Sequence, residues 1–292
     1  MEIEVEDVSF SYRYPGKEIK ALKGINLKIC PGELLVIAGA SGSGKSTLAE
    51  LLAGLKLPTA GSVYLDGVAT SARGALVKRL RRRVGIAFQY PERQLFAETV
   101  AEDVAFGPRN LGLPEQEVER RVEISLLSVG LDPEIYRRCS PFSLSGGQQR
   151  RVALAGILAM EPEVLILDEP TAGLDPEGRR ALLALVQAYH RQPGKAVVLI
   201  SHHLAEVARL ATRLVVLCRG EIVFKGGVRE LFATGERLAE WGLAPPPLVE
   251  VLLALKKKGA DISPVALTLE EAERELLGWL KGVRPPLKAL PH

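Results

Sequence analysis

The stretch LLVIAGASGSGKST, from Leu34 to Thr47, decides how this chain folds. Its first five residues are apolar, as in a buried strand, and the glycines that follow allow a tight turn. The remainder reads G-x-x-x-x-G-K-S, the pattern of a loop that wraps a phosphate between a strand and a helix. We therefore predict a strand, this loop and a helix from about Ser46 to Ala53, whose first N–H groups and dipole attract the anion.

The loop residues are the first predicted nucleotide site. Backbone N–H groups approach the phosphates closely where glycine leaves no Cβ in the way. Lys45 is expected to hold the β and γ phosphates and to act in catalysis, and the Ser46 hydroxyl is expected to bind Mg²⁺. The predicted nucleotide-binding residues here are Gly39, Ala40, Ser41, Gly42, Ser43, Gly44, Lys45, Ser46 and Thr47.

Two carboxylates follow a second apolar run, Val164 to Leu167. An isolated Asp-Glu pair favours a solvated strand end. Behind a phosphate loop, however, the carboxyl end of a parallel strand is where α/β sheets bind ligands. We predict that Asp168 holds Mg²⁺ through water and that Glu169 orients the attacking water or accepts its proton.

Polar residues also follow two other strand-like runs. His202 comes after Val197 to Ile200, and Gln89 comes after Val84 to Phe88. We predict that His202 donates a hydrogen bond to the γ phosphate and that Gln89 reaches Mg²⁺ or the attacking water.

The pentapeptide LSGGQ, Leu144 to Gln148, predicts a second phosphate cradle. Ser145 is a good N-cap, and Gly146 and Gly147 permit close approach to the start of a helix. One nucleotide has room for only one cradle at its β and γ phosphates, and Gly39 to Thr47 already provides it. The second cradle, which includes Gln148, is therefore expected to bind the ATP of another chain.

Over about its first 230 residues the chain resembles an ATP-binding cassette (ABC) ATPase. The motifs stand in family order: the P-loop, the Q-loop at Gln89, the LSGGQ signature, Walker B at Val164 to Glu169, the D-loop at Gly173 to Asp175, and the switch histidine, His202. The resemblance implies ATP and Mg²⁺, two ATPase subunits joined head to tail, an adenine-stacking aromatic at Tyr12 or less well at Tyr14, and a nucleotide-site role for Asp175.

The sequence after Gln89 resembles that of the ATPases of energy-coupling-factor (ECF) importers. Tyr90-Pro91-Glu92-x-Gln94-Leu95-Phe96 is similar to the second ATPase of such a pair. These systems take up vitamins, cobalt or nickel. The resemblance implies a second ATPase, either a paralogue or a copy of this chain, a membrane scaffold bound through Gln89 to Asn110, and a substrate-binding membrane protein contacted indirectly. It also places the chain peripherally on the cytoplasmic face of the cell membrane.

The segment from Pro91 to Asn110 combines apolar and acidic residues, which favours a groove for a basic coupling helix. Its apolar residues are Leu95, Phe96, Val100, Val104 and Phe106, and its acidic ones are Glu92, Glu98, Glu102 and Asp103. The alternative is an amphipathic helix with a solvated acidic face.

Composition limits the remaining possibilities. A hydrophobic fraction of 47% and a charged fraction of 25% are those of a globular protein, and no apolar run approaches a membrane span. The net charge of +3 does not indicate a nucleic-acid partner, and the basic cluster Lys78 to Arg83 reads as a solvated helix end.

The predicted fold class is α/β: a P-loop NTPase core with a mainly parallel sheet, preceded by an antiparallel lobe. Residues 1–232 form the predicted nucleotide-binding domain, with a helical subdomain at about 89–143, and residues 233–292 form a helical extension. Helices are expected at Leu248 to Lys258 and at Thr268 to Lys281, the second with a capping box between Thr268 and Glu271 and an apolar stripe of Leu276, Leu277 and Leu280. That stripe is either intramolecular core or a dimer contact. The last ten residues, 283–292, are expected to be loose.

Two other interpretations stay open: another class of ABC transporter, and a non-transport ABC ATPase such as a DNA-repair enzyme or a translation factor. The single set of motifs and the lack of a heptad insertion argue against the non-transport class.

Overall fold

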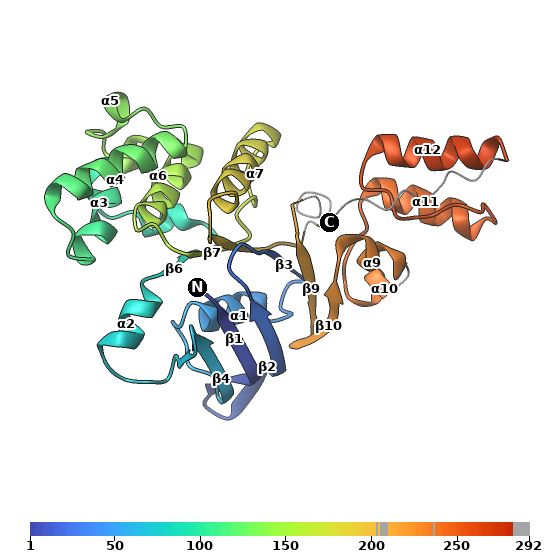
Figure 1. Cartoon of the computed structure of the whole chain (residues 1–292), viewed down its shortest axis with the longest axis horizontal. Helices are drawn as coiled ribbons and strands as arrows, with labels where there is room; N and C mark the ends of the chain where they lie inside the picture. Colours follow the sequence, from blue (N-terminus) through green and yellow to red (C-terminus); the bar gives the residue numbers. More distant parts are fainter. Residues whose placement is uncertain (203, 205–209, 236, 283–292) are drawn as a thin grey trace.

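The computed structural model describes residues 1–202, 204, 210–235 and 237–282. Its strands form two sheets, a four-stranded sheet with the order β2-β1-β4-β5 and a six-stranded sheet with the order β10-β9-β3-β8-β7-β6. Figure 1 shows the smaller sheet on one side of the larger one, and a group of helices on the other.

The six-stranded sheet is mainly parallel, as predicted. Its parallel strands are β3 (Leu34–Ala38), β6 (Val84–Ala87), β7 (Val164–Asp168), β8 (Ala196–Ile200) and β9 (Arg213–Cys218). The edge strand β10 (Glu221–Gly226) runs antiparallel to β9. Strands β3, β7 and β8 are buried along their whole length, because both faces of the sheet are covered.

The predicted antiparallel lobe is the smaller sheet. Strand β1 (Ile3–Tyr14) pairs with β2 (Lys17–Ile29) and with β4 (Ala60–Leu65), and β5 (Val68–Ala69) closes the edge. Helix α1 (Lys45–Leu52) packs with this lobe in one hydrophobic core, which includes Leu35 and Ile37 from one face of β3. The alternate residues Leu34 and Val36 belong to the core on the other face.

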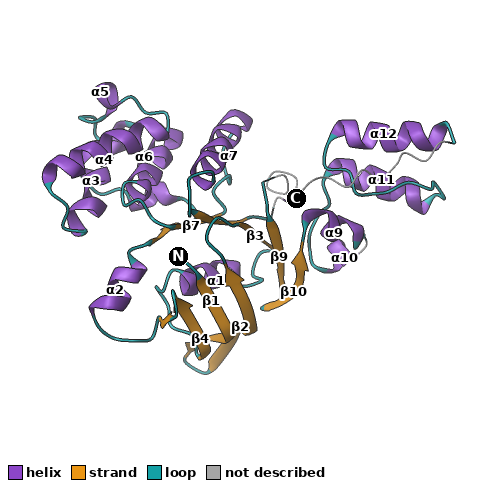
Figure 2. Cartoon of the chain, viewed as in Figure 1, coloured by secondary structure: helices purple, strands orange, loops and turns teal. Residues whose placement is uncertain are grey.

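Helices cover that other face (Figure 2). After α2 (Ala75–Arg81) and β6, the chain forms η1 (Pro91–Gln94), α3 (Val100–Asn110), α4 (Glu115–Ser128), α5 (Pro133–Tyr136), η2 (Pro141–Ser143) and α6 (Gly146–Leu158). Helix α7 (Pro176–His190) follows β7. Helix α6 lies directly on β6, since a Cβ at Gly85 would lie 2.8 Å from the side chains of Ile157 and Pro162.

Four further helices follow β10: α9 (Val228–Ala233), α10 (Arg237–Glu240), α11 (Pro247–Lys257) and α12 (Leu269–Leu280). Residues of α9 and α10 join the main core, whereas α11 and α12 also share a small core of their own around Leu252, Ala272 and Leu276. None of the helices described here is both long and apolar enough to cross a membrane. The segment 283–292, expected to be loose, lies outside the described residues.

The predicted capping box of α12 is half formed. The Thr268 side chain accepts a hydrogen bond from the Glu271 N–H at 3.2 Å. The Glu271 carboxylate, however, accepts from the N–H of Leu267 and from Arg229 instead of from the N–H of Thr268. The expected apolar stripe also divides, because Leu276 packs inward while Leu277 and Leu280 are exposed.

Candidate active site

Four predicted site segments follow strands at one edge of the sheet. The strands β3, β6, β7 and β8 are parallel, so their carboxyl ends meet at that edge. Asp168 ends β7, where it pairs in register with Ile200 at the end of β8, two residues before His202. The phosphate loop follows β3, and Gln89 lies exposed after β6. The sheet therefore brings the sequence-predicted residues to a common edge.

The phosphate loop is shaped by two glycines that contact other strands. Gly44 caps α1 with φ 106°, a left-handed conformation that disfavours side chains. A Cβ at Gly39 would overlap the backbone carbonyl of Leu217, and one at Gly44 would lie 2.6 Å from the carbonyl of Ala21. The loop is thus held by β9 and β2 as well as by its own helix.

Lys45 is buried inside the loop. Its Nζ donates hydrogen bonds to the carbonyl oxygens of Gly39 at 2.8 Å and Ala40 at 2.9 Å. Burial lowers the pKa of the Lys45 ammonium, and the carboxylates of Glu169 and Asp168 oppose that effect. The ammonium therefore lies within the electrostatic reach of both carboxylates, and its charge can neutralise that of a phosphate bound in the loop.

Asp168 is buried, and one of its oxygens has no protein partner. Burial raises the pKa of its carboxyl, while a hydrogen bond with Ser46 and the charge of Lys45 act in the opposite direction. Within the described part of the chain, Oδ1 of Asp168 makes no hydrogen bond. A buried carboxylate oxygen without a donor is suited to a cation.

Glu169 and His202 contact each other directly. The Nδ1 atom of His202 lies 2.7 Å from both carboxylate oxygens of Glu169. Glu169 has a left-handed backbone, φ 49°, and its N–H donates to the carbonyl of Ile200 at 3.0 Å. The sequence had predicted both residues at the γ phosphate but not this contact between them.

Tyr12 lies beside the end of the phosphate loop. Its hydroxyl is 3.0 Å from the Thr47 Oγ1, and it accepts a hydrogen bond from the Lys56 Nζ at 2.9 Å. The same ammonium lies 4.4 Å from the centre of the Tyr12 ring. Tyr14, the weaker candidate, is more than half exposed near the β1–β2 turn.

The signature segment forms a complete capping box. The Ser145 Oγ accepts from the Gln148 N–H, and the Gln148 side chain accepts from the Ser145 N–H at 3.0 Å. A Cβ at Gly146 or Gly147 would find no described atom within 4 Å, so the start of α6 is open to a ligand. Asp175, by contrast, caps α7 by accepting from the Gly178 N–H at 2.6 Å.

Comparison with known proteins agrees with this geometry. The sequence model of the ABC transporter family matches residues 22–172. The chain belongs to the ABC transporter family. It therefore binds ATP and is an ATPase.

The relatives of this ABC cassette match almost its whole length. A protein of Symbiobacterium thermophilum called "Energy-coupling factor transporter ATP-binding protein EcfA2" is 51% identical, over 97% of this chain and 98% of the relative. A protein of Caldanaerobacter subterraneus subsp. tengcongensis with the same description is 46% identical, over 97% and 99%.

Among solved structures, cbiO1 from Clostridium perfringens, described as part of the ABC transporter complex cbiONQ, is 35% identical and superposes with a TM-score of 0.71. It covers 87% of this chain and 98% of its own. The ATP-binding cassette MJ0796, in a dimeric post-hydrolysis state with ADP and Pi, is 30% identical with a TM-score of 0.71, over 78% and 99%.

Arg150 is a site residue that the sequence analysis missed. It lies on α6, two residues after the signature, and is 7% exposed. Its Nη1 donates at 2.6 Å to the carbonyl of Ala172, directly before the D-loop, and its Nε lies 3.8 Å from the Glu92 carboxylate on η1. The sequence alone gave no signal for it, because Arg150 stands between two glutamines and Arg151 on the same helix.

Proposed function

We propose that this chain is the ATP-hydrolysing subunit of an ECF-type importer of vitamins or transition-metal ions, the second ATPase of its pair. Relatives described as ECF transporter ATP-binding proteins, 43–51% identical over at least nine tenths of the chain, carry the class of transporter. The open signature cradle supports the mechanism, since it offers N–H groups to a phosphate from outside the chain.

Hydrolysis in this proposal needs positioning and charge neutralisation more than covalent chemistry. Lys45 releases the carbonyls of Gly39 and Ala40 and binds the β and γ phosphates. Glu169 orients the attacking water and takes its proton. His202 holds the Glu169 carboxylate in place through Nδ1, and with a proton on each ring nitrogen it would also donate from Nε2 to the γ phosphate.

Mg²⁺ is the proposed metal, and the residues present fit it. Its proposed ligands are the Ser46 hydroxyl and the Asp168 carboxylate, whose Oδ1 lacks a hydrogen bond among the described residues. Gln89 is a further proposed ligand. When bound, the ion neutralises charge that develops on the phosphates.

The proposed working unit is a head-to-tail pair of ATPases. Each ATP lies between the P-loop of one subunit and the signature residues Ser145 to Gly147 of its partner. Asp175 has no direct nucleotide contact in this proposal; its cap of α7 shapes the D-loop at the interface instead. Loss of the γ phosphate removes charge-assisted contacts to the opposing signature, and the pair reopens.

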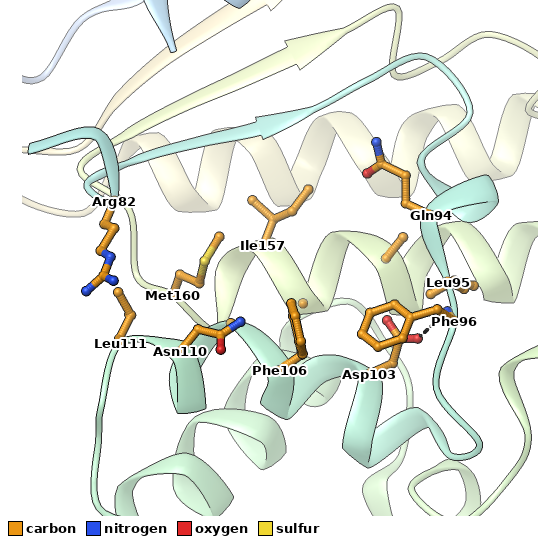
Figure 3. A pocket seen from close by; sticks show the side chains of 13 residues that line it. Arg82, Gln94, Leu95, Phe96, Asp103, Phe106, Asn110, Leu111, Ile157 and Met160 are labelled. Carbon is orange, nitrogen blue, oxygen red and sulfur yellow. Dashed lines mark hydrogen bonds between the residues drawn. The ribbon is translucent and has the colours of Figure 1, made fainter. Parts of the chain in front are cut away.

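A groove on the helical subdomain is the proposed site for the membrane scaffold. A cavity of about 310 Å³ lies between α3, the segment after η1, and α6. Figure 3 shows Phe96 and Phe106 beside each other, with Ile157 of α6 and Met160, just after that helix, also lining the cavity. The two phenylalanine rings pack edge to face with centres 4.9 Å apart, and they are 59% and 51% exposed. Exposed aromatic rings of this kind are typical anchors of an interface.

The structure changes the acidic part of the predicted groove. The Asp103 carboxylate accepts hydrogen bonds from the N–H groups of Phe96 and Ala97, so it shapes the loop. Glu102 completes the capping box of α3, and Glu92 pairs with Arg150. Leu95, Val100 and Val104 are buried in the core. The cavity lining is therefore mainly apolar, with Asp103 and Arg82 as its charged residues, while Glu98 and Glu102 are exposed outside it.

Co-purification of the ATPase with an ECF scaffold and a paralogous ATPase tests this function. We expect Phe106→Ala combined with Glu98→Lys to lower the recovered scaffold at least tenfold, because both the aromatic anchor and the attraction for a basic helix are lost. ATP hydrolysis by the isolated subunit should stay unchanged.

The matched control is Leu127→Ala combined with Glu123→Lys, which alters an exposed apolar and an exposed acidic residue on α4. It should leave scaffold recovery at the level of the unmodified protein. Equal recovery with the groove variant would exclude this surface, and no assembly of the unmodified chain with any ECF scaffold would exclude the importer.

The chain is proposed to divide into a nucleotide-binding domain, residues 1–232, and a carboxyl-terminal extension, residues 233–292, whose residues Leu238 and Leu243 pack in the main core. The exposed face of α12, which carries Leu277, Trp279 and Leu280, is the proposed additional contact between the paired ATPases. Scaffold binding would then hold the pair at the cytoplasmic face of the membrane.

A further inference from the structure

The turn after α10 touches the phosphate loop. A Cβ built on Gly242 would lie 2.8 Å from the Cβ of Ala40, the second residue of the loop, and 3.9 Å from its Cα. Real Cβ atoms essentially never approach another heavy atom that closely. Gly242 thus lies in van der Waals contact with Ala40, although 202 residues of the chain separate the two.

This turn is rigidly supported. The flanking residues Leu238 and Leu243 are buried in the main core, and the Leu243 N–H donates to the Leu238 carbonyl at 2.9 Å. The Gly242 N–H donates to the carbonyl of Ala239 at 3.0 Å, and the Trp241 ring packs against Phe224 of β10. The turn therefore cannot yield without breaking core contacts.

Ala40 is equally confined on its other side. Its carbonyl accepts hydrogen bonds from the Lys45 Nζ at 2.9 Å and from the Ser43 N–H at 3.2 Å. The preceding residue, Gly39, lies so close to the Leu217 carbonyl of β9 that no Cβ fits there. Any displacement of Ala40 must therefore change the path of the loop that binds the phosphates.

From these contacts we infer that the turn from Trp241 to Leu243 is a positioning element of the nucleotide site. It fixes the position of Ala40, whose carbonyl accepts a hydrogen bond from Lys45 before nucleotide binds. It thereby fixes the path of the loop that admits the phosphates. The carboxyl-terminal extension thus sets nucleotide affinity in the same chain, independently of any partner. Gly242 is the required residue, because it combines a left-handed φ of 68° with this close approach.

Equilibrium titration of the full chain with trinitrophenyl-ATP tests this inference. Gly242→Ala forces the two Cβ atoms apart by several tenths of an ångström, and we expect the affinity to fall about tenfold, because small displacements of a binding site are costly. Gly235→Ala is the matched control: its φ is 59°, but its new Cβ meets only an ordinary 3.7 Å contact with Leu253. It should be strained in the same way and keep its affinity within twofold.

Rescue separates this contact from a general loss of structure. Adding Ala40→Gly to Gly242→Ala removes the Cβ that is met, so the double variant should bind nucleotide within twofold of Ala40→Gly alone. Gly242→Asn is a second test of the contact, since asparagine tolerates a left-handed backbone better than alanine does but introduces the same Cβ. It should lose affinity as Gly242→Ala does, with a smaller fall in Tm.

Equal affinities of Gly242→Ala and Gly235→Ala would overturn the inference, and so would a double variant that binds no better than Gly242→Ala. These titrations use the isolated ATPase. A failed assembly with the membrane scaffold therefore leaves their outcome unaffected.

Discussion

At the scale of single residues, Arg150 joins three segments that hydrolysis has to coordinate. Its guanidinium binds the carbonyl of Ala172, directly before the D-loop, and faces Glu92 on η1, while its backbone belongs to the signature helix. Among the described residues, Nη2 of Arg150 and Oε2 of Glu92 have no hydrogen-bond partner although both are buried. The pair at 3.8 Å has room to tighten, and we expect Arg150 to act as a positioning residue between the proposed scaffold groove and the D-loop.

We predict that Arg150→Lys lowers kcat about tenfold while the Kd for nucleotide stays within twofold, because an ammonium cannot hold both neighbours in the planar geometry of a guanidinium. Steady-state ATPase kinetics and nucleotide titration measure the two quantities. Arg151→Lys, at the exposed neighbouring position, is the control and should change neither. A parallel loss of affinity in Arg150→Lys would show a general structural role.

Local patterns predicted where these residues lie in the fold better than they predicted the contacts among them. Lys45, Asp168, Glu169 and His202 each follow a recognisable strand or loop pattern, and all lie at the same edge of the sheet. The contact between Glu169 and His202 spans 33 residues of chain and depends on the register of β7 against β8, which sequence does not give. The contact of Gly242 with Ala40 could not be predicted either, because it joins segments that lie far apart in the sequence.

At the scale of elements, Glu163 ties the antiparallel lobe to the core sheet. The Arg83 guanidinium binds both of its carboxylate oxygens, at 2.6 and 2.7 Å, and the same guanidinium binds Asp66 in the β4–β5 turn. The amino group of Met1 also donates to Glu163 at 3.0 Å. The Arg83 hydrogen bonds, with that amino group, hold the pKa of Glu163 at about 2, below its usual 4.5.

This cluster predicts part of the acid sensitivity of the protein. Because the folded state lowers the pKa of Glu163, its carboxylate stabilises the fold fully above pH 4.5, and that stabilisation is lost as the pH falls towards 2. Glu163→Gln should therefore lower the urea midpoint at pH 6, and the difference from the unmodified protein should shrink by pH 3. Glu123→Gln, on the exposed face of α4, should follow the unmodified protein throughout. A constant difference between pH 6 and pH 3 would contradict this assignment.

Most elements were predictable from sequence because their signals are local. The apolar runs gave the core strands, and the Gly-rich and capping patterns gave the starts of α1 and α6. The α12 cap differed because Arg229, 42 residues earlier, draws the Glu271 carboxylate away from the Thr268 N–H. The inward and outward leucines of α12 likewise depended on where α11 packs, which the helical period alone leaves undetermined.

At the scale of the whole molecule, each nucleotide site in the proposed pair is completed by residues of two cassettes. We predict that Glu169→Gln binds ATP, loses turnover at least a hundredfold, and accumulates as a dimer in size-exclusion chromatography with ATP, because an amide cannot accept the proton of the water. Combining it with Ser145→Arg, which fills the open cradle, should restore the monomer at the same ATP concentration. Unimpaired turnover by Glu169→Gln would exclude Glu169 from the catalytic role, and a dimer insensitive to Ser145→Arg would contradict the shared site.

The contact at Gly85 determines how the helical subdomain can move. The far end of α6, at Ile157, rests on β6 so closely that not even a methyl group fits between them. Any tilt of the subdomain must therefore pivot near this end, and Gly146, eleven residues away, is about 17 Å from the pivot. With that lever arm, which follows from a helical rise of about 1.5 Å per residue, a tilt of about 10° would move the signature by roughly 3 Å. A change too slight to disturb the buried sheet is thus large enough to open or close a phosphate contact.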